Sequence, residues 1–296
     1  MPRLKQTRQD RIFDFVNYIL LGLMLLAVLY PLYFIVIASV SDPNAINSGQ
    51  VWFWPKNLTF EGYERILGDS AIWRGYRNSI LYTALGTTIN VFLTLTAAYA
   101  LSRKDLVGRN LIMFFFAFTM FFSGGLIPTY LVVRDLKMIN TIWALVIPNA
   151  VAVWNIIIAR TFFESTIPQE LLEAAQIDGC SNTKFFWKIV LPLAKPLIAI
   201  MILFYGIGHW NSFFDALIYL RDEALYPLQI ILRNILIQNE MSAQMVMDVE
   251  SYAAQQRVAE LVKYGVIMVA SVPPLILYPF LQKYFVKGVF VGSIKG

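Results

Sequence analysis

The polar side chains between residues 205 and 215 are the ones in this chain whose types and spacing could do chemistry. They are Tyr205, His209, Trp210, Asn211 and Asp215. All five lie within a long apolar stretch, where polar groups are costly to bury and are therefore functional candidates. Their rings could stack on a passing solute while their polar groups bond to its hydroxyls. The alternative is that they only hold neighbouring helices together.

Residue counts exclude two other kinds of chemistry. His209 is the sole histidine and Cys180 the sole cysteine, which leaves no His/Cys zinc site and no intrachain disulfide. On one helix Asp215 would follow His209 by about 600°, or about 240° after one full turn, so they would point in different directions and would not meet as an acid–base pair. We therefore expect no catalytic residue, no metal and no bound cofactor.

The elements that must position these residues are membrane spans. The 296 residues are 58% hydrophobic and 15% charged, with a mean hydropathy of +0.59, more than a water-soluble core needs. About 20 apolar residues cross a bilayer, and six windows reach that length: 18–40, 80–101, 111–131, 141–163, 197–220 and 264–281. The predicted fold class is an all-α polytopic membrane protein, with a tail over 1–16 and six transmembrane helices within 17–296.

Charge predicts the orientation of these spans. The two ends of the chain and the second and fourth connections hold more than half of the 24 lysines and arginines but fewer than half of the 19 acidic residues. Basic residues concentrate on the cytoplasmic side, so both termini are predicted to be cytoplasmic. The long segments 41–79 and 221–263 are then external loops. The basic residues form no stripe of the kind that binds nucleic acid.

The cytoplasmic segment 166–192 carries a helix pattern. Thr166 and Gln169 have the spacing of a capping box, and Pro168 suits a first turn, so a helix is predicted from near residue 167 to residue 178. Gly179 should stop it with a positive φ. A second short helix is expected over 183–190, with prolines ending it before the fifth span.

Two surfaces are expected on the first of these helices. Leu171, Ala174 and Ala175 should share one face, and Glu170 and Glu173 should project from an adjacent one. Small residues allow a close approach of another backbone. The alternative is an amphipathic helix lying on the inner leaflet, but such helices usually carry lysine or arginine on the polar face. The acidic face favours a protein partner.

The run E-A-A-Q-I-D-G at 173–179, followed after nine residues by I-V-L-P at 189–192, resembles the EAA signature of permease subunits in ATP-driven, binding-protein-dependent (ABC) importers. The resemblance covers nearly the whole chain and includes W-N-S-F-F-D-A-L-I-Y-L at 210–220. It is similar to the carbohydrate-importing branch, and in particular to the shorter of its two permeases, which have the MetI-like fold.

This resemblance implies a coupling helix that docks in a groove of the cytoplasmic ATPase. The residues it places in that contact are Glu170, Glu173, Ala174, Ala175, Asp178 and Gly179. ATP and Mg belong to that ATPase, since the chain contains no G-x-x-x-x-G-K-[ST] phosphate loop. The implied partners are a second homologous permease, two ATP-binding subunits and an extracellular or periplasmic solute-binding protein, in a bacterial plasma (inner) membrane.

The resemblance also implies half of a translocation pathway for an oligosaccharide, and the branch includes importers of acidic plant or algal glycans. An importer of amino acids, peptides or metals is the alternative. The external loop 221–263 would contact the binding protein, or else rest on its own domain, through a polar, methionine-containing run: Gln238, Asn239, Glu240, Met241 and Ser242.

Proline and glycine interrupt two of the predicted spans. Ser123, Gly124 and Gly125 fall in the third span, and Pro148 falls in the fourth. Both residue types are common in membrane helices, so packing kinks are expected here, with a gate hinge as the alternative.

Overall fold

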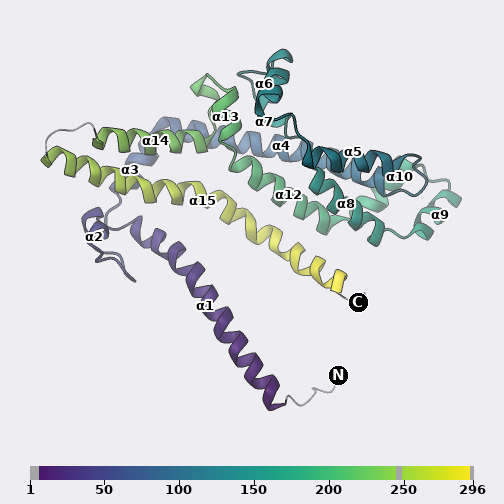
Figure 1. Cartoon of the computed structure of the whole chain (residues 1–296), viewed down its shortest axis with the longest axis horizontal. Coiled ribbons are helices and arrows are strands. Elements are labelled where there is room, and N and C mark those ends of the chain that lie inside the picture. The colour runs from purple at the N-terminus through teal and green to yellow at the C-terminus, as the bar shows by residue number, and fades with distance from the viewer. Residues whose placement is uncertain (1–6, 245–248, 294–296) are drawn as a thin grey trace. The chain divides into compact units, whose positions relative to one another are not determined.

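The computed structural model describes the backbone of residues 7–244 and 249–293, and the side chains of 7–238, 257, 259–279 and 282. Every regular element in this described part is a helix (Figure 1). The chain divides into two compact units, 1–69 with 234–271 and 70–233 with 272–296. The all-α fold class is therefore confirmed.

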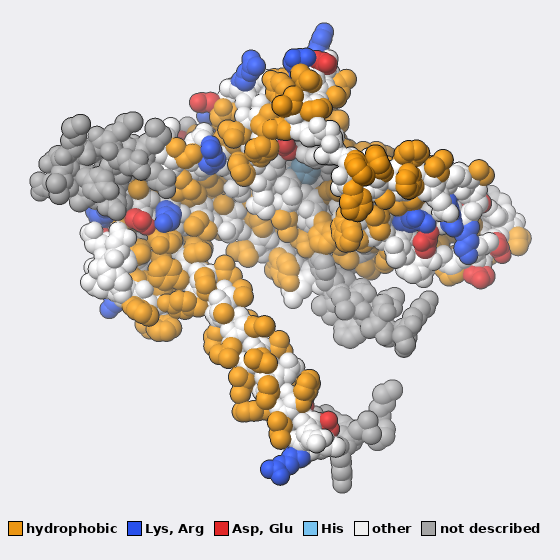
Figure 2. Space-filling model, in the orientation of Figure 1, with side chains coloured by type: hydrophobic (Ala, Val, Ile, Leu, Met, Phe, Trp, Pro, Cys, Tyr) orange, Lys and Arg blue, Asp and Glu red, His pale blue; other side chains and the backbone are white. Residues whose placement is uncertain are grey.

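The first unit contains a long apolar helix and a small folded part. Helix α1, Arg8–Ala38, begins at a capping box in which Thr7 and Asp10 exchange hydrogen bonds, and its apolar side chains are exposed along most of its length (Figure 2). Helices α2, Pro43–Asn47, and α3, Glu61–Gly68, follow. The unit also holds the end of α14, Leu228–Gln244, and the start of α15, Val249–Ser293.

Close packing fixes α3 against α15 within this unit. A Cβ on Gly62 would lie 2.7 Å from the carbonyl oxygen of Leu261, so only glycine permits this approach. Arg257 of α15 reaches Asp42 at 3.3 Å and Glu61 at 3.7 Å. These contacts pack α3 and the segment around Asp42 against residues 257–261 of α15.

The second unit holds the predicted coupling segment and the predicted pathway residues. Helix α4, Ser70–Ser102, is followed by α5, Arg109–Phe121, α6, Leu126–Asp135, α7, Trp143–Val146, and α8, Val153–Thr166. Next come α9, Gln169–Ile177, α10, Asn182–Phe185, the π-helical turn η1, Phe186–Val190, and α11, Leu191–Leu193. Helices α12, Lys195–Trp210, and α13, Phe214–Tyr219, precede the 3₁₀ turn η2, Glu223–Leu225. Helix α4 packs along α8 and α12 (Figure 1).

The membrane spans are less regular than the sequence predicts. By length and composition, three described helices could cross a membrane unbroken: Arg8–Ala38, Ser70–Ser102 and Ala259–Pro279. Two further apolar pairs are sharply bent, Arg109–Phe121 with Leu126–Asp135 by 114° and Asn182–Leu193 with Lys195–Trp210 by 81°. The count of six spans is not confirmed, because the predicted fourth span is divided between α7 and α8.

Two expectations about breaks need correction. The break at Gly125, whose φ is +80°, turns the chain by 114° rather than producing a packing kink. The predicted fifth span is also interrupted, since α12 ends at Trp210 and α13 begins at Phe214. The segment 221–263 includes η2, α14 and the start of α15, and its external location stays a prediction.

Candidate functional site

Helix α9 in the 166–192 segment begins two residues later than predicted. The capping box is wrong, because Thr166 is the last residue of α8 and the N-cap of α9 is Pro168, which makes no side-chain hydrogen bond. An N-cap needs a non-helical backbone, whereas Thr166 lies within a helix. The Gln169 side chain instead donates to Glu173 Oε1 at 2.9 Å.

Gly179 ends α9 in a Schellman motif. Its φ is +71°, the left-handed conformation that glycine adopts without strain. The Cys180 N–H donates to the Ala175 carbonyl at 2.8 Å, and the Gly179 N–H donates to the Gln176 carbonyl at 3.0 Å. These two bonds satisfy carbonyls that the helix end leaves free. The predicted glycine stop is confirmed.

The two alanines of the EAA run lie on different faces of α9. Ala175 is 8% exposed and belongs to the core cluster, with Leu171 packed partly against it. Ala174 is exposed, so the predicted shared face of Leu171, Ala174 and Ala175 is wrong for Ala174. Ile177 is 87% exposed. The Ala174–Ile177 spacing of i, i+3 was a signal for an outward patch that sequence reasoning missed.

An outward surface of α9, called here the α9 patch, therefore has a definite composition. It contains the small residue Ala174 and the apolar Ile177, bordered by carboxylates and the glycine turn. All its members are exposed: Glu170, Glu173, Ala174, Ile177, Asp178 and Gly179. Five of the six predicted coupling residues lie on this patch. The sixth, Ala175, is buried in the core cluster and holds α9 in place.

The core cluster joins α9 to the long helices of the second unit. Ala98 and Leu101 of α4, Phe163 of α8 and Phe185 of α10 are buried in the same cluster as Ala175. Tyr99 of α4 completes this junction, with ring centroids 5.9 Å from Phe163 and 4.9 Å from Phe186. Helix α9 is thus packed in one close-packed core with α4, α8 and the η1 turn.

Arg103, which sequence reasoning missed, ties the end of α4 to the segment after the glycine turn. Its guanidinium donates to Asn182 Oδ1 at 3.2 Å and forms a two-pronged contact with Asp105, at 2.8 and 2.6 Å. These hydrogen bonds lower the pKa of the Asp105 carboxyl below its usual value. Asp105 therefore stays ionised and keeps the guanidinium of Arg103 oriented.

A polar stripe on α4 meets the predicted pathway residues of α12. The stripe consists of Gly86, Asn90 and Thr94, spaced i, i+4, i+8 so that they share one face. Asn90 is 1% exposed and Thr94 is fully buried. Sequence reasoning missed this stripe, although its spacing within an apolar span was a readable signal.

His209 is held in a socket on this stripe. A Cβ on Gly86 would lie 2.4 Å from His209 Nε2, so the imidazole occupies the space that glycine leaves open. Nε2 is 3.1 Å from Asn90 Oδ1, and Asn90 Nδ2 donates to the Asn149 carbonyl at 2.8 Å. Since Asn90 Oδ1 can only accept a hydrogen bond, Nε2 of His209 is the donor in this contact.

Tyr205 makes a second connection one turn away. Its hydroxyl lies 2.7 Å from Thr94 Oγ1 and accepts the Ala152 N–H at 3.2 Å. Asn149 Nδ2 donates to Asp215 Oδ2 at 2.8 Å. The residues 147–152 between α7 and α8 are thereby bonded to α4, α12 and α13. We name these side chains the span-break network: Asn90, Thr94, Asn149, Tyr205, His209 and Asp215.

The remaining predicted residues have varied surroundings. Trp210 is buried, with its ring 6.1 Å from that of Tyr76. Asn211 is exposed at the C-cap of α12, and Asp215 lies beyond the break that follows it. Gln238 is exposed on α14. The side chains of Asn239, Glu240, Met241 and Ser242 lie outside the described residues.

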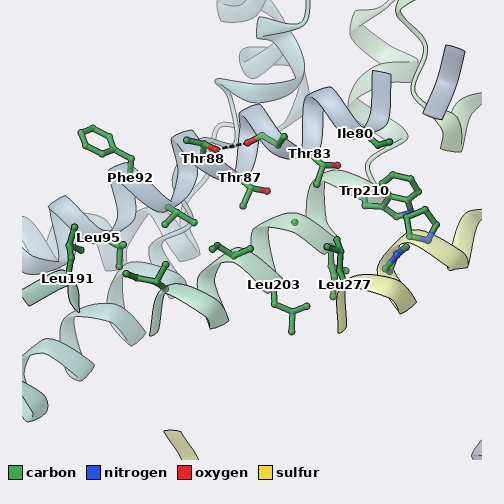
Figure 3. A pocket seen from close by; sticks show the side chains of 18 of the residues that line it. Ile80, Thr83, Thr87, Thr88, Phe92, Leu95, Leu191, Leu203, Trp210 and Leu277 are labelled. Atoms are coloured by element: carbon green, nitrogen blue, oxygen red, sulfur yellow. Dashed lines mark hydrogen bonds between the residues drawn. The ribbon is translucent and has the colours of Figure 1, made fainter. Parts of the chain in front are cut away.

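A groove of about 870 Å³ runs between α4, α12 and residues 273–277 of α15 (Figure 3). Its lining is mostly aliphatic and aromatic. Thr83 and Thr87 project from α4 into it, and their hydroxyls have no partner among the described residues. Such an apolar surface is unsuited to a hydroxyl-rich solute. The span-break network is the more polar candidate for a pathway wall.

Known proteins of similar sequence cover the whole length of the chain. Protein LplC of Bacillus subtilis is 39% identical over 99% of this chain and 98% of its own. The polygalacturonan/rhamnogalacturonan transport system permease protein YtcP of the same organism is 39% identical over 97% of this chain and 100% of its own. The search against protein-family models found no match.

A solved structure has the same fold. It is a crystal structure of a bacterial ABC transporter involved in the import of the acidic polysaccharide alginate. The matched chain is 36% identical to this one, with a TM-score of 0.83 over 95% of this chain and 99% of the other. A galactooligosaccharide transport permease, GanQ of Bacillus subtilis, is 30% identical over 95% of both chains. The protein is a multi-pass membrane protein, a transport component rather than an enzyme, and it belongs to the family of permease subunits of carbohydrate ABC importers.

Proposed function

We propose that the chain forms half of the translocation pathway for an acidic oligosaccharide in a bacterial plasma membrane, with both termini cytoplasmic. The single observation that carries the substrate class is the whole-chain match, at 36% identity and a TM-score of 0.83, to a permease of an alginate importer. The YtcP relative, named for polygalacturonan and rhamnogalacturonan, supports it. Importers of amino acids, peptides or metals are not favoured by these relatives.

A competition assay tests this substrate class. Cells or proteoliposomes carrying the complete importer take up a labelled acidic oligosaccharide, and unlabelled competitors are added. An oligouronide should compete strongly, and its methyl-esterified form, matched in length but without charge, should compete weakly. Equal competition by the two forms would contradict an acidic substrate, and competition by amino acids or peptides alone would contradict a carbohydrate.

Coupling is proposed to occur at the α9 patch. The complete assembly would contain a second homologous permease, two ATP-binding subunits and a solute-binding protein, with ATP and Mg held by the ATP-binding subunits and no cofactor by this chain. The supporting observation is the construction of α9: an outward patch anchored by Ala175 and closed by a Schellman turn. Such a helix moves as a rigid body.

Crosslinking from the two alanines should separate the faces of α9. In a Cys180→Ser background, we expect Ala174→Cys to crosslink to the ATP-binding subunit in the purified complex, because Ala174 is exposed on the α9 patch. Ala175→Cys, buried beneath it at 8% exposure, is the matched control and should give only background. Equal yields from both positions, or none from Ala174→Cys, would contradict docking through this patch.

The pathway residues are proposed to have two roles. Tyr205, His209 and Asp215 shape the pathway wall, since each is bonded to a neighbouring segment, and Trp210 shapes it because its side chain is buried. Asn211 and Asn149 are exposed and are proposed to face the solute. Gln238, Asn239, Glu240, Met241 and Ser242 are proposed to contact the solute-binding protein.

A further inference from the structure

The break in the predicted fourth span has backbone groups that bond to side chains of other helices. A break inside a membrane leaves backbone N–H and C=O groups free, and each must be satisfied by protein. Here one free carbonyl, on Asn149, accepts from Asn90, and one free amide, on Ala152, donates to Tyr205. Both partners come from the long helices α4 and α12, which are distant from 147–152 in sequence.

Two discontinuities of the second unit lie beside this network. They are residues 147–152, between α7 and α8, and residues 211–213, between α12 and α13. Transporters commonly build their working sites at discontinuous helices. Asn90 lies within α4, which is long and apolar enough to cross a membrane.

The packed core already holds the neighbouring helices to α4, because Tyr82 of α4, Leu145 of α7 and Ala216 of α13 are buried in one cluster. The hydrogen bonds of the network act instead on the 147–152 break. They join it to α4 through Asn90, to α12 through Tyr205 and to α13 through the Asn149–Asp215 bond at 2.8 Å. Asn90 also bonds to His209, so this one side chain of α4 contacts both α12 and the break.

We infer that Asn90 is a positioning residue, which fixes the 147–152 break to α4 and α12 so that α7 and α8, on either side of the break, move together when α9 is displaced. This inference rests on the proposed coupling function. Asn90 acts through His209 and the Asn149 carbonyl and not by touching the solute. Its loss should therefore change how efficiently ATP hydrolysis drives transport, and not the apparent affinity for the solute.

The experiment uses the complete importer in proteoliposomes with its solute-binding protein. For Asn90→Leu, we expect the number of solutes moved per ATP hydrolysed to fall about tenfold, the effect of about 1.4 kcal/mol, with an unchanged KM for the loaded binding protein. Thr161→Val is the matched control, because Thr161 is exposed and its hydroxyl donates to the carbonyl of Ile157 in its own helix, its one partner among the residues that the structure describes. It should behave as wild type.

Conservative variants keep the test decisive if Asn90→Leu fails to assemble. His209→Gln retains a donor toward Asn90 Oδ1 and should keep most of the coupling, whereas His209→Leu should lose it. Asn90→Asp keeps the acceptor for His209 but loses the donor to the Asn149 carbonyl, and should be intermediate.

The inference would be overturned by wild-type coupling in Asn90→Leu, by wild-type coupling in both Asn90→Asp and His209→Leu, or by a raised KM with normal coupling. Failure of the proposed coupling function is a different result, since the wild-type complex itself would then show no ATP hydrolysis stimulated by the loaded binding protein.

Discussion

Gly179→Asp is expected to abolish the ATP hydrolysis that the loaded binding protein stimulates, while the chain still inserts and assembles. Gly179 has a φ of +71°, and a Cβ there would meet nothing within 4 Å. The folded chain has room for the side chain, and a non-glycine residue in this conformation costs only about 1–2 kcal/mol. The new carboxylate would instead project from the α9 patch and obstruct docking.

The size of this effect follows from the free energy that coupling must supply to change the conformation of the permease. Shifting a two-state equilibrium from 1:99 to 99:1 takes about 5.5 kcal/mol of differential binding. The apolar part of the α9 patch consists of Ala174 and Ile177 alone. A carboxylate added beside them would therefore disturb most of the apolar contact with the ATP-binding subunit. The measurement is the ratio of stimulated to basal ATP hydrolysis in the purified complex, with assembly checked by size-exclusion chromatography.

Gly49→Asp is the matched control for this prediction. Gly49 also has a positive φ, +69°, and a Cβ there would again lie in open space, but the residue belongs to the first unit, far along the chain from α9. The same backbone strain and the same charge at Gly49 should leave the stimulation unchanged. Normal stimulation in Gly179→Asp, or equal loss in both variants, would argue against docking at the glycine turn.

Gly86→Ala should destabilise the second unit. A methyl group there would lie 2.4 Å from His209 Nε2 and 2.5 Å from Cε1, so the imidazole must leave its socket and lose its bond to Asn90. Overpacking of this kind costs about 1–3 kcal/mol, and the displaced polar groups add to it. We expect a lower midpoint of thermal unfolding in detergent and a lower yield of assembled complex.

The neighbouring glycine of α12 provides the control. A Cβ on Gly208 meets nothing within 4 Å, so Gly208→Ala should leave the midpoint unchanged or raise it slightly through helix propensity. The double variant Gly86→Ala with His209→Ala removes the clash and should recover part of the loss. If Gly86→Ala melts like Gly208→Ala, the socket described for His209 is not present.

The sequence alone determined the parts of this protein that depend on local chemistry. Apolar length predicts an all-helical membrane chain, because backbone groups in lipid must be satisfied within each segment. The glycine stop at Gly179 was equally readable, since only glycine adopts a positive φ without strain. The EAA run and its spacing to I-V-L-P indicated the family, which is confirmed, and predicted the coupling segment, which stays a prediction.

Only the tertiary structure decided which residues of those segments face which way. Ala174 and Ala175 are adjacent in sequence and identical in type, yet one is exposed and the other is buried in the core cluster. Likewise, Asn90 and His209 are 119 residues apart, and no local pattern joins them. Burial and pairing depend on which helices pack together, and a break such as 147–152 is stable only because distant side chains complete its hydrogen bonds.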